Sequence, residues 1–286
     1  MSASVAAEAP AVVAGRQGPQ RRRKQRRWTR FVLPTYTTLV LLYLVLPIAI
    51  VVLYSFNQSL TPLPRVSFTW QGFTFRWYKE LFSIPGLTPA FFLSLRLAAV
   101  STVLSAVLGT LVALALVRHR FRGKGAMEQI MFLNIAAPEI VLGASLLGFF
   151  CTLGLPRGFF TLLIAHVAFS IAYVSITVRA RLAGFDRSIE EAAQDLGADP
   201  WVTFRKITLP IIFPGVLAGA LMAFALSIDD YVISSFVTGS QETFPIWVFG
   251  ASRVGIPPQV FVFGTIIFMA GVSLALTSLI LQTRKR

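Results

Sequence analysis

The sequence predicts an all-α membrane protein with six transmembrane helices. Apolar residues make up 55% of its 286 residues and charged residues only 13%, and the mean hydropathy is +0.71. A soluble domain of this size carries about 25% charged residues. The chain therefore has too little charge to cover a water-facing surface, and lipid is the natural solvent for most of it.

The first element in order is a polar tail. Residues 1–30 are rich in Ala, Pro, Gly, Gln and Arg. Such a segment cannot bury enough apolar area to offset the entropy of ordering it, so we expect a disordered, basic, cytoplasmic tail. The apolar run that follows is too long for a signal peptide and is not closed by a small-residue cleavage site, which indicates an uncleaved first span.

Apolar stretches long enough to cross a bilayer core of about 30 Å follow the tail. The backbone of a lipid-embedded segment must satisfy its own hydrogen bonds, so each stretch is predicted to be a helix. The chain divides into a first span with an outer segment (31–90), a core domain (91–282) and a cytoplasmic end (283–286). Prolines such as Pro47, Pro138 and Pro214 can kink these helices. The six predicted spans are 31–55, 91–117, 130–153, 158–178, 212–236 and 260–282.

The distribution of positive charge predicts the orientation of these spans. Twenty of the 26 Lys and Arg residues fall in the tail, the loops after spans two and four, and the C-terminus. An even number of spans puts all of these on one side, which the positive-inside rule makes cytoplasmic. The net charge of +14 is thus a topology signal, and nucleic-acid binding is not expected.

The loop at about 179–211 is the largest predicted cytoplasmic connection, and its sequence predicts two short helices. Ser188 with Glu191 forms a predicted capping box for the first helix, and Gly197 is well placed to end it. Asp199-Pro200 is typical of an N-cap followed by proline at the first helical position. The second helix is expected to end near Thr208, before Pro210 turns the chain towards span five.

A spaced motif runs through this loop. It consists of Glu191-Ala192-Ala193, three residues, Gly197, nine residues, and Ile207-x-Leu209-Pro210. It resembles the EAA signature of the permeases of binding-protein-dependent ABC importers. The resemblance implies a type I importer transmembrane domain whose first loop helix docks on a separate ATPase subunit, with Glu191 and Gly197 at the docking elements.

Such a docked helix would act as a lever, because closure of an ATPase dimer on ATP would move it and the bundle with it. The chain itself has no nucleotide site, since its Gly123-Lys124-Gly125 lacks the P-loop pattern. The resemblance therefore implies two copies of an ATP-binding subunit, a second permease subunit and an extracytoplasmic solute-binding protein, in the bacterial inner membrane. No enzymatic activity and no cofactor are expected.

Other segments narrow the resemblance. Residues 68–78, 118–124, 138–141 and 227–239 are similar to those of spermidine/putrescine importer permeases, closest to the C-type subunit. The similarity covers about 30–285 and leaves out the tail. It implies transport of polyamines, while the same machinery for an organic cation, iron or thiamine stays an alternative.

Acidic residues within or near the spans are candidates for the substrate path, because a buried carboxylate in a membrane is costly. They are Glu139, Asp229 and Asp230, and Tyr231 and Trp247 could offer aromatic faces to an ammonium group. Alternatively, the Asp pair binds Arg96 or Arg253 or caps a helix, and Glu139 makes a structural ion pair.

Three further features have ordinary explanations. His166 lies within span four, where a helix–helix hydrogen bond is favoured over a proton relay. No metal-ligand spacing is evident. Gly215 and Gly219 have the G-x-x-x-G spacing of close helix packing, and the partner permease is one candidate for the facing helix.

The sequence argues against two other classes of protein. A stand-alone secondary transporter predicts inverted repeats and broken helices in both halves, which the sequence does not suggest. An intramembrane enzyme would need a catalytic constellation within the spans, and none is evident.

Overall fold

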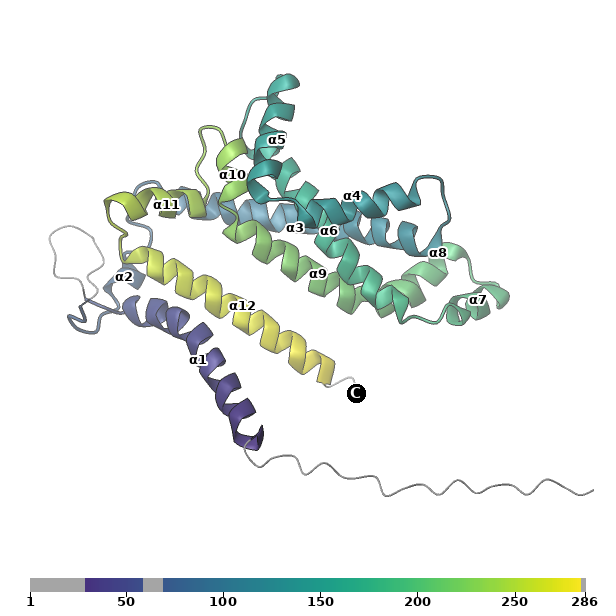
Figure 1. The fold of residues 1–286 in the computed structure, drawn as a ribbon, viewed down its shortest axis with the longest axis horizontal. Coiled ribbons are helices and arrows are strands. Elements are labelled where there is room, and N and C mark those ends of the chain that lie inside the picture. Colours follow the sequence, from purple (N-terminus) through teal and green to yellow (C-terminus); the bar gives the residue numbers. More distant parts are fainter. Residues whose placement is uncertain (1–28, 59–68, 284–286) are drawn as a thin grey trace, which may run out of the picture. The chain divides into compact units, whose positions relative to one another are not determined.

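The computed structural model describes residues 29–58 and 69–283 (Figure 1). The predicted disordered tail thus lies almost wholly outside the described residues, as do residues 284–286. The chain divides into two units, one ending at Val51 and one beginning at Val52. The helices are α1 (Thr29–Tyr54), α2 (Arg76–Lys79), α3 (Leu87–Arg118), α4 (Lys124–Ala136), α5 (Glu139–Thr152), α6 (Phe159–Ala183), α7 (Ser188–Asp195), α8 (Pro200–Thr203), a π-helical segment (Phe204–Thr208), α9 (Leu209–Asp229), α10 (Val232–Val237), α11 (Phe244–Val254) and α12 (Gln259–Thr283).

The all-α membrane fold is confirmed. Within the described ranges the extended pairing is a single bridge between Asn57 and Phe73. Among the residues that the structure describes, four stretches are long and apolar enough to span a membrane, and they correspond to predicted spans one, two, four and five: Val32–Tyr54, Leu87–Arg118, Phe159–Ala183 and Pro200–Asp229. The sixth predicted span is helical as α12, but its apolar part over Gln259–Ser273 is shorter. The number six therefore stays a prediction.

The third predicted span, 130–153, is not one continuous helix, and it is interrupted at Pro138, one of the prolines expected to kink a span. It consists of α4 and α5, which are bent by 113° at the break between them. Pro138 causes this break, because it has no amide hydrogen and forces the preceding residue out of the helical region. Ala137 accordingly has φ −70° and ψ 138°. The pair is a broken span or a re-entrant loop.

Helices α3, α6 and α9 pack together as the core of the second unit (Figure 1). Val174 of α6 lies between two glycines. A β-carbon at Gly109 of α3 would lie 2.7 Å from Val174 Cβ, and one at Gly219 of α9 would lie 3.1 Å from Val174 Cα. Gly215 faces Arg181 of α6 in the same way. The G-x-x-x-G pair therefore serves packing within this chain, not against a partner permease.

Helices α5 and α10 pack against each other beside this core. A β-carbon at Gly143 of α5 would lie 2.6 Å from the Phe236 ring. A buried apolar cluster joins these two helices to α3 and α6. Its members are Leu97, Phe150, Leu162, Ala165, Phe169, Ile233 and Val237. The break between α4 and α5 is thereby brought close to the break between α9 and α10.

Candidate functional site

Helix α7 carries the first part of the EAA-like motif, and it begins differently from the prediction. Ser188 is already its first residue, and Arg187, the N-cap residue, makes no side-chain capping bond. The predicted capping box of Ser188 and Glu191 is therefore wrong. Instead, the Ser188 amide donates to Asp186 Oδ1 at 3.0 Å. This hydrogen bond lowers the pKa of the exposed Asp186 carboxyl.

Helix α7 ends at a glycine turn, as predicted. Gly197 has φ +86°, a conformation that residues with a β-carbon adopt at a cost. Its amide donates to Gln194 O at 2.8 Å, and the Ala198 amide donates to Ala193 O at 3.0 Å. These two bonds form the Schellman motif, which satisfies the last carbonyls of the helix.

The two neighbouring acids of α7 have opposite environments. The Glu191 side chain is 63% exposed and pairs at 3.3 Å with Arg187 of the same loop. Ala192 is exposed and Ala193 half-buried. The Glu190 side chain is only 5% exposed and accepts hydrogen bonds from Arg118 Nη1 and Thr208 Oγ1. Sequence reasoning missed this role of Glu190, because its neighbour carries the motif.

The surroundings of Glu190 change the pKa of its carboxyl in two opposite directions. Burial raises the pKa of the Glu190 carboxyl, but the hydrogen bonds from Arg118 and Thr208 and the charge of Arg118 outweigh burial. The net pKa lies below the ordinary value. Glu190 is thus held as a carboxylate against a guanidinium, which is the strong form of hydrogen bond.

The second half of the loop begins as predicted and continues differently. Asp199 Oδ1 accepts from the Trp201 amide at 3.1 Å, and Pro200 occupies the first turn of α8. The chain then does not turn at Pro210, since Pro200–Asp229 forms one 30-residue helical stretch.

The π-helical segment explains this continuity. The Leu209 amide reaches back five residues to Phe204 O, so one wider turn accommodates a proline that has no amide to donate. Ile207 and Leu209 are half-buried in this region, and Pro210 is exposed.

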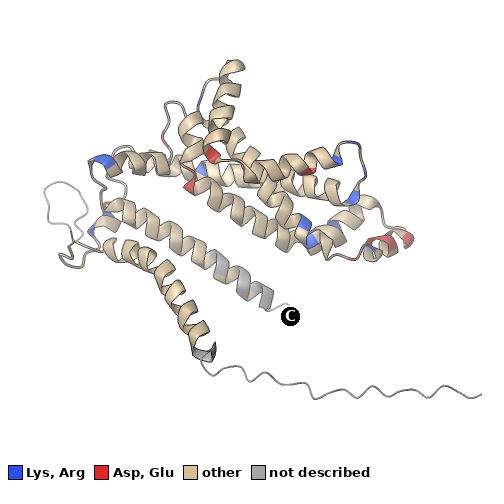
Figure 2. Ribbon diagram, viewed as in Figure 1, with Lys and Arg blue, Asp and Glu red and all other residues tan. Residues whose placement is uncertain are grey.

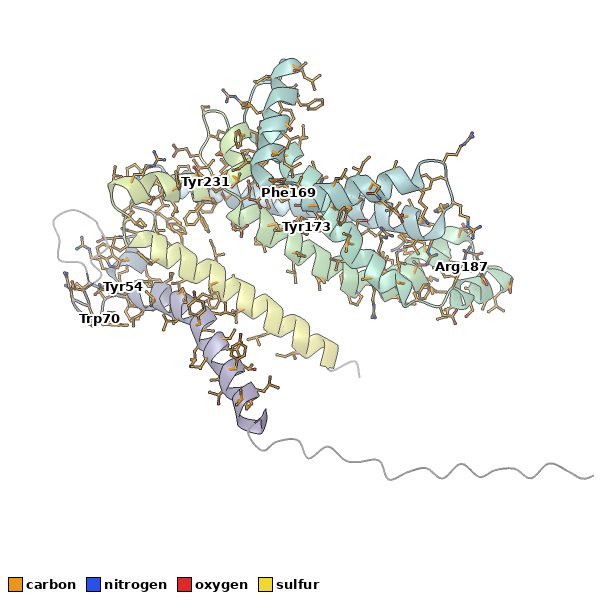
Figure 3. The ribbon with its side chains drawn as sticks, viewed as in Figure 1. Tyr54, Trp70, Phe169, Tyr173, Arg187 and Tyr231 are labelled. Carbon is orange, nitrogen blue, oxygen red and sulfur yellow. The ribbon has the colours of Figure 1, made fainter. Side chains whose placement is uncertain are left out.

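Figure 2 shows where the charges of this end of the core lie: basic residues gather near the α3–α4 connection and the end of α6, and acidic residues lie on α7. Figure 3 places Arg187 beside α7, far along the core from Tyr231. The loop and the predicted substrate path are thus at separate places in the second unit.

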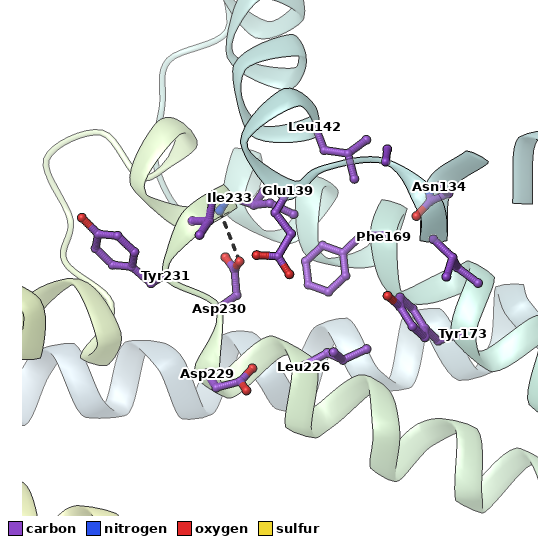
Figure 4. Close-up of a pocket in the computed structure, with 13 residues that line it drawn as sticks. Asn134, Glu139, Leu142, Phe169, Tyr173, Leu226, Asp229, Asp230, Tyr231 and Ile233 are labelled. Atoms are coloured by element: carbon purple, nitrogen blue, oxygen red, sulfur yellow. Dashed lines mark hydrogen bonds between the residues drawn. The ribbon is translucent and has the colours of Figure 1, made fainter. Parts of the chain in front are cut away.

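The predicted path residues meet in a cavity of about 300 Å³ at the two helix breaks (Figure 4). The structure brings together Glu139, Asp229, Asp230 and Tyr231, but Trp247 is not among the lining residues. Trp247 packs instead on the cluster around Trp77 and Phe263. The cavity is lined by Asn134, Ile135, Ala137, Glu139, Leu142, Phe169, Tyr173, Leu226, Asp229, Asp230, Tyr231, Val232 and Ile233.

Asp230 caps the helix that follows it. Its Oδ2 accepts from the Ser234 amide and hydroxyl, both at 2.7 Å, and its Oδ1 accepts from the Ile233 amide at 3.2 Å. The side chain is 6% exposed. Of the alternatives that the sequence left open, helix capping is therefore correct for Asp230.

Glu139 and Asp229 are the more accessible acids of the cavity. Both are exposed, Glu139 as the first residue of α5 and Asp229 as the last of α9. The three carboxylates are close enough for Asp230 and Glu139 to repel the charge of Asp229. The arginines suggested as partners face aromatic rings, with Arg96 4.8 Å from the Phe159 ring and Arg253 4.9 Å from the Phe249 ring.

The aromatic lining comes mainly from α6. Phe169 and Tyr173 are one helical turn apart and line the cavity, whereas the Tyr231 ring points away from the carboxylates in Figure 4 and contacts Phe249, with ring centroids 4.6 Å apart. Sequence reasoning missed the two α6 residues. The spacing from His166 could have indicated them, because His166, Phe169 and Tyr173 are at positions i, i+3 and i+7 and therefore lie on one face of the helix.

His166 is fully buried and makes the helix–helix hydrogen bonds that the sequence favoured. Its Nδ1 lies 2.7 Å from Ser227 Oγ of α9, and its Nε2 lies 3.0 Å from Ser234 Oγ of α10. Ser101 of α3 donates to Ser227 at 3.1 Å. This network thus joins four helices behind the cavity. Among the described residues no group of three His, Cys, Asp or Glu could hold a metal ion.

Comparison with known proteins points to one family. Residues 105–284 match the family described as binding-protein-dependent transport system inner membrane component. The spermidine/putrescine transport system permease protein PotC of Haemophilus influenzae is 40% identical over 256 residues, which are 89% of this chain and 97% of that protein. The putrescine transport system permease protein PotI of Escherichia coli is 42% identical over 236 residues, 80% and 82% of the two chains.

Solved structures show the same fold. A chain of a bacterial ABC transporter involved in import of the acidic polysaccharide alginate superposes with a TM-score of 0.63. The two chains are 19% identical, and the match covers 91% of this chain and 97% of that one.

Proposed function

Because this chain belongs to the family of binding-protein-dependent transport system inner membrane components, we propose that it is the permease subunit of an ATP-driven importer of polyamines. The similarity to PotC extends over 89% of the chain, which supports the same solute class. The family is one of transport permeases, not of enzymes.

The observation that carries the solute assignment is the composition of the cavity. Three carboxylates face it, and none of its lining residues is Lys, Arg or His. A polyamine is a flexible chain of ammonium groups joined by methylenes, which carboxylates and aromatic faces both suit. A solute with its own carboxylate would meet only repulsion from the acids. Glu139 and Asp229 are proposed as the ammonium acceptors, with Asp230 holding the cavity wall.

The exposed face of α7 is proposed as the docking surface for the ATPase subunit. Glu191 and Ala192 lie on it, and large apolar side chains flank them at Ile189, Leu196 and Trp201, which are 47%, 90% and 65% exposed. An exposed apolar patch rimmed by charge is typical of a protein interface. Gly197, Ile207, Leu209 and Pro210 shape the turn and the helix that carry this surface.

The proposed complex contains two ATP-binding subunits, a second permease subunit and an extracytoplasmic solute-binding protein. The part of the chain that the structure describes has four helices that could span a membrane, or five with the bent pair, which is too few to enclose a two-sided pathway and supports a second permease. The excess of Lys and Arg in the loops supports the proposal that both termini lie on the cytoplasmic side of the inner membrane.

The first test is a pull-down of the tagged chain from native membranes in mild detergent, followed by mass spectrometry. We expect an ATPase subunit, a second permease and a binding protein. Recovery of the chain alone, under conditions that preserve other complexes, would favour a stand-alone transporter.

The solute is tested next in proteoliposomes that hold the purified complex and the binding protein, with ATP on the ATPase side. Labelled spermidine and putrescine should accumulate only with ATP, and unlabelled polyamine should compete while thiamine should not. ATP-dependent uptake of thiamine, iron or another organic cation in place of polyamine would replace the solute and leave the importer assignment intact.

A further inference from the structure

One buried carboxylate joins the docking helix to two helices of the core. Glu190 accepts through Oε2 from Arg118, the last residue of α3, and through Oε1 from Thr208 of the π-helical segment. Both of its oxygens are therefore used. The Arg118 guanidinium also lies over the Phe185 ring, 5.7 Å from its centroid, in the connection that enters α7.

The covalent connections of α7 are weak links by comparison. The chain enters the helix through residues 184–187 and leaves it through the glycine turn at Gly197. Rotation at these two short connections could absorb a displacement of α7 before it reached the core. The Glu190 contacts bypass both connections.

The helix held by Thr208 leads directly to the cavity. Thr208 lies within the uninterrupted stretch Pro200–Asp229, whose 30 residues are about 45 Å long at 1.5 Å per residue. Its far end carries Asp229, which lines the cavity. The other donor, Arg118, ends α3, which carries Ser101 of the network behind the cavity. Both partners of Glu190 thus belong to helices that extend to the candidate solute site.

Separating these partners is unfavourable. A buried carboxylate that loses its guanidinium is left uncompensated in a medium of low dielectric, so α7 and its two partners are held together. We propose that Glu190 is the positioning residue that makes α7, the end of α3 and the long helix ending at Asp229 move as one body. This rests on the proposed coupling of α7 to an ATPase. Glu191, about 100° further round the helix, faces the ATPase while Glu190 faces the core.

The test uses the whole complex in proteoliposomes and measures the ratio of solute taken up to ATP hydrolysed. For Glu190→Ala we expect the ATPase to stay bound and the ratio to fall about tenfold, a typical magnitude for coupling between sites. Thr208→Val should lower the ratio less, because the Arg118 contact remains. Glu128→Ala is the matched control, since it breaks an Arg–carboxylate pair between α4 and α6 that does not touch α7.

Three outcomes would overturn the proposal: an unchanged ratio in Glu190→Ala, an equal fall in Glu128→Ala, or loss of the ATPase subunit, which would make Glu190 a docking residue. If Glu190→Ala does not fold, Glu190→Gln provides the same reading, because it keeps the shape and removes the charge.

A second readout does not depend on the solute. Spin labels at the exposed Gln194 of α7 and Ala225 of α9, in a Cys151→Ser background, report the distance between the docking helix and the cavity end of the long helix. ATP should leave this distance unchanged in the native chain, because the helices move together, and change it in Glu190→Ala. An equal change in both chains would contradict the proposal. If polyamine uptake is absent while the distances behave as expected, only the solute assignment fails.

Discussion

His166 and Asp230 approach each other to 3.5 Å, between Nε2 and Oδ2, at the point where α9 breaks before α10. Ser234 bridges them, because its hydroxyl donates to Asp230 at 2.7 Å and lies 3.0 Å from His166 Nε2. Its single hydrogen is thus used, so His166 donates from Nε2, while Nδ1 shares a second hydrogen bond with Ser227. Ser101, Ser227, His166, Ser234 and Asp230 thus form one hydrogen-bonded chain.

This network predicts that His166 stabilises the bundle. His166→Leu removes both ring nitrogens, so Ser227 and Ser234 each lose one buried hydrogen bond, at about 0.5–1.5 kcal/mol each. The melting temperature of the detergent-solubilised protein should fall by several degrees, and less for His166→Gln. Ser235→Ala is the control, since that exposed hydroxyl donates to Val232 O of its own helix. A leucine variant as stable as the native chain would show that apolar packing replaces the network at no cost.

Neutralising the accessible acids of the cavity should weaken polyamine transport. Glu139→Gln and Asp229→Asn each remove one charged acceptor, so the KM for spermidine should rise about tenfold or more. The measurement is initial uptake into proteoliposomes over a range of spermidine concentrations. Glu242→Gln, an exposed acid outside the cavity lining, should leave the KM unchanged. A fall in maximal rate without a change in KM would contradict ammonium binding at these residues.

Gly197 should be sensitive to substitution for a conformational reason alone. A β-carbon there would meet nothing within 4 Å, so the cost of Gly197→Ala is the strain of its left-handed backbone, about 1–2 kcal/mol. We expect less ATPase subunit in the pull-down, with Gly197→Asn affected less because Asn tolerates this conformation.

Gly184→Ala is the matched control for that experiment. Gly184 also ends a helix, but its φ of −92° is ordinary and a β-carbon would only touch Arg181 O at 4.0 Å. Equal losses in the two alanine variants would mean that the backbone conformation of Gly197 is not what matters for docking.

The lowered pKa of Glu190 predicts that α7 loosens in acid. A carboxyl whose pKa is lowered by folding stabilises the fold fully when the pH is above its ordinary pKa, which is 4.5 for Glu190. This contribution is lost as the pH falls through the lower pKa of the folded state. A spin label at Gln194 should become more mobile over that range, and the Glu190→Gln variant should not show this step.

Asp186 also titrates below its ordinary pKa at the start of α7, so Asp186→Asn separates its contribution. If the mobility step disappears in that variant and persists in Glu190→Gln, the acid sensitivity belongs to the first turn of α7.

Local signals in the sequence predicted much of this molecule. Hydropathy located the helices, the distribution of Lys and Arg suggested their orientation, and Asp199-Pro200 and Gly197 marked helix ends, because each of these depends on a residue and its immediate neighbours. Proline positions were less informative. At Pro138 the chain breaks into α4 and α5, which are bent by 113°. Pro210, in contrast, is accommodated in a continuous helix, since the π-helical turn can form there.

What only the tertiary structure decided is which side chains meet. Glu139 and Asp229 are 90 positions apart and share a cavity because α5 and α10 pack together beside α6. Both Glu190 and Glu191 suit a helix equally well, so the sequence of α7 does not decide which one is buried. Glu190 is buried and Glu191 exposed because α7 packs against Arg118 and Thr208 with the face that carries Glu190. Composition and short motifs thus determined the class of protein and its family, while long-range packing determined the site, because burial of a given side chain depends on elements distant in the chain.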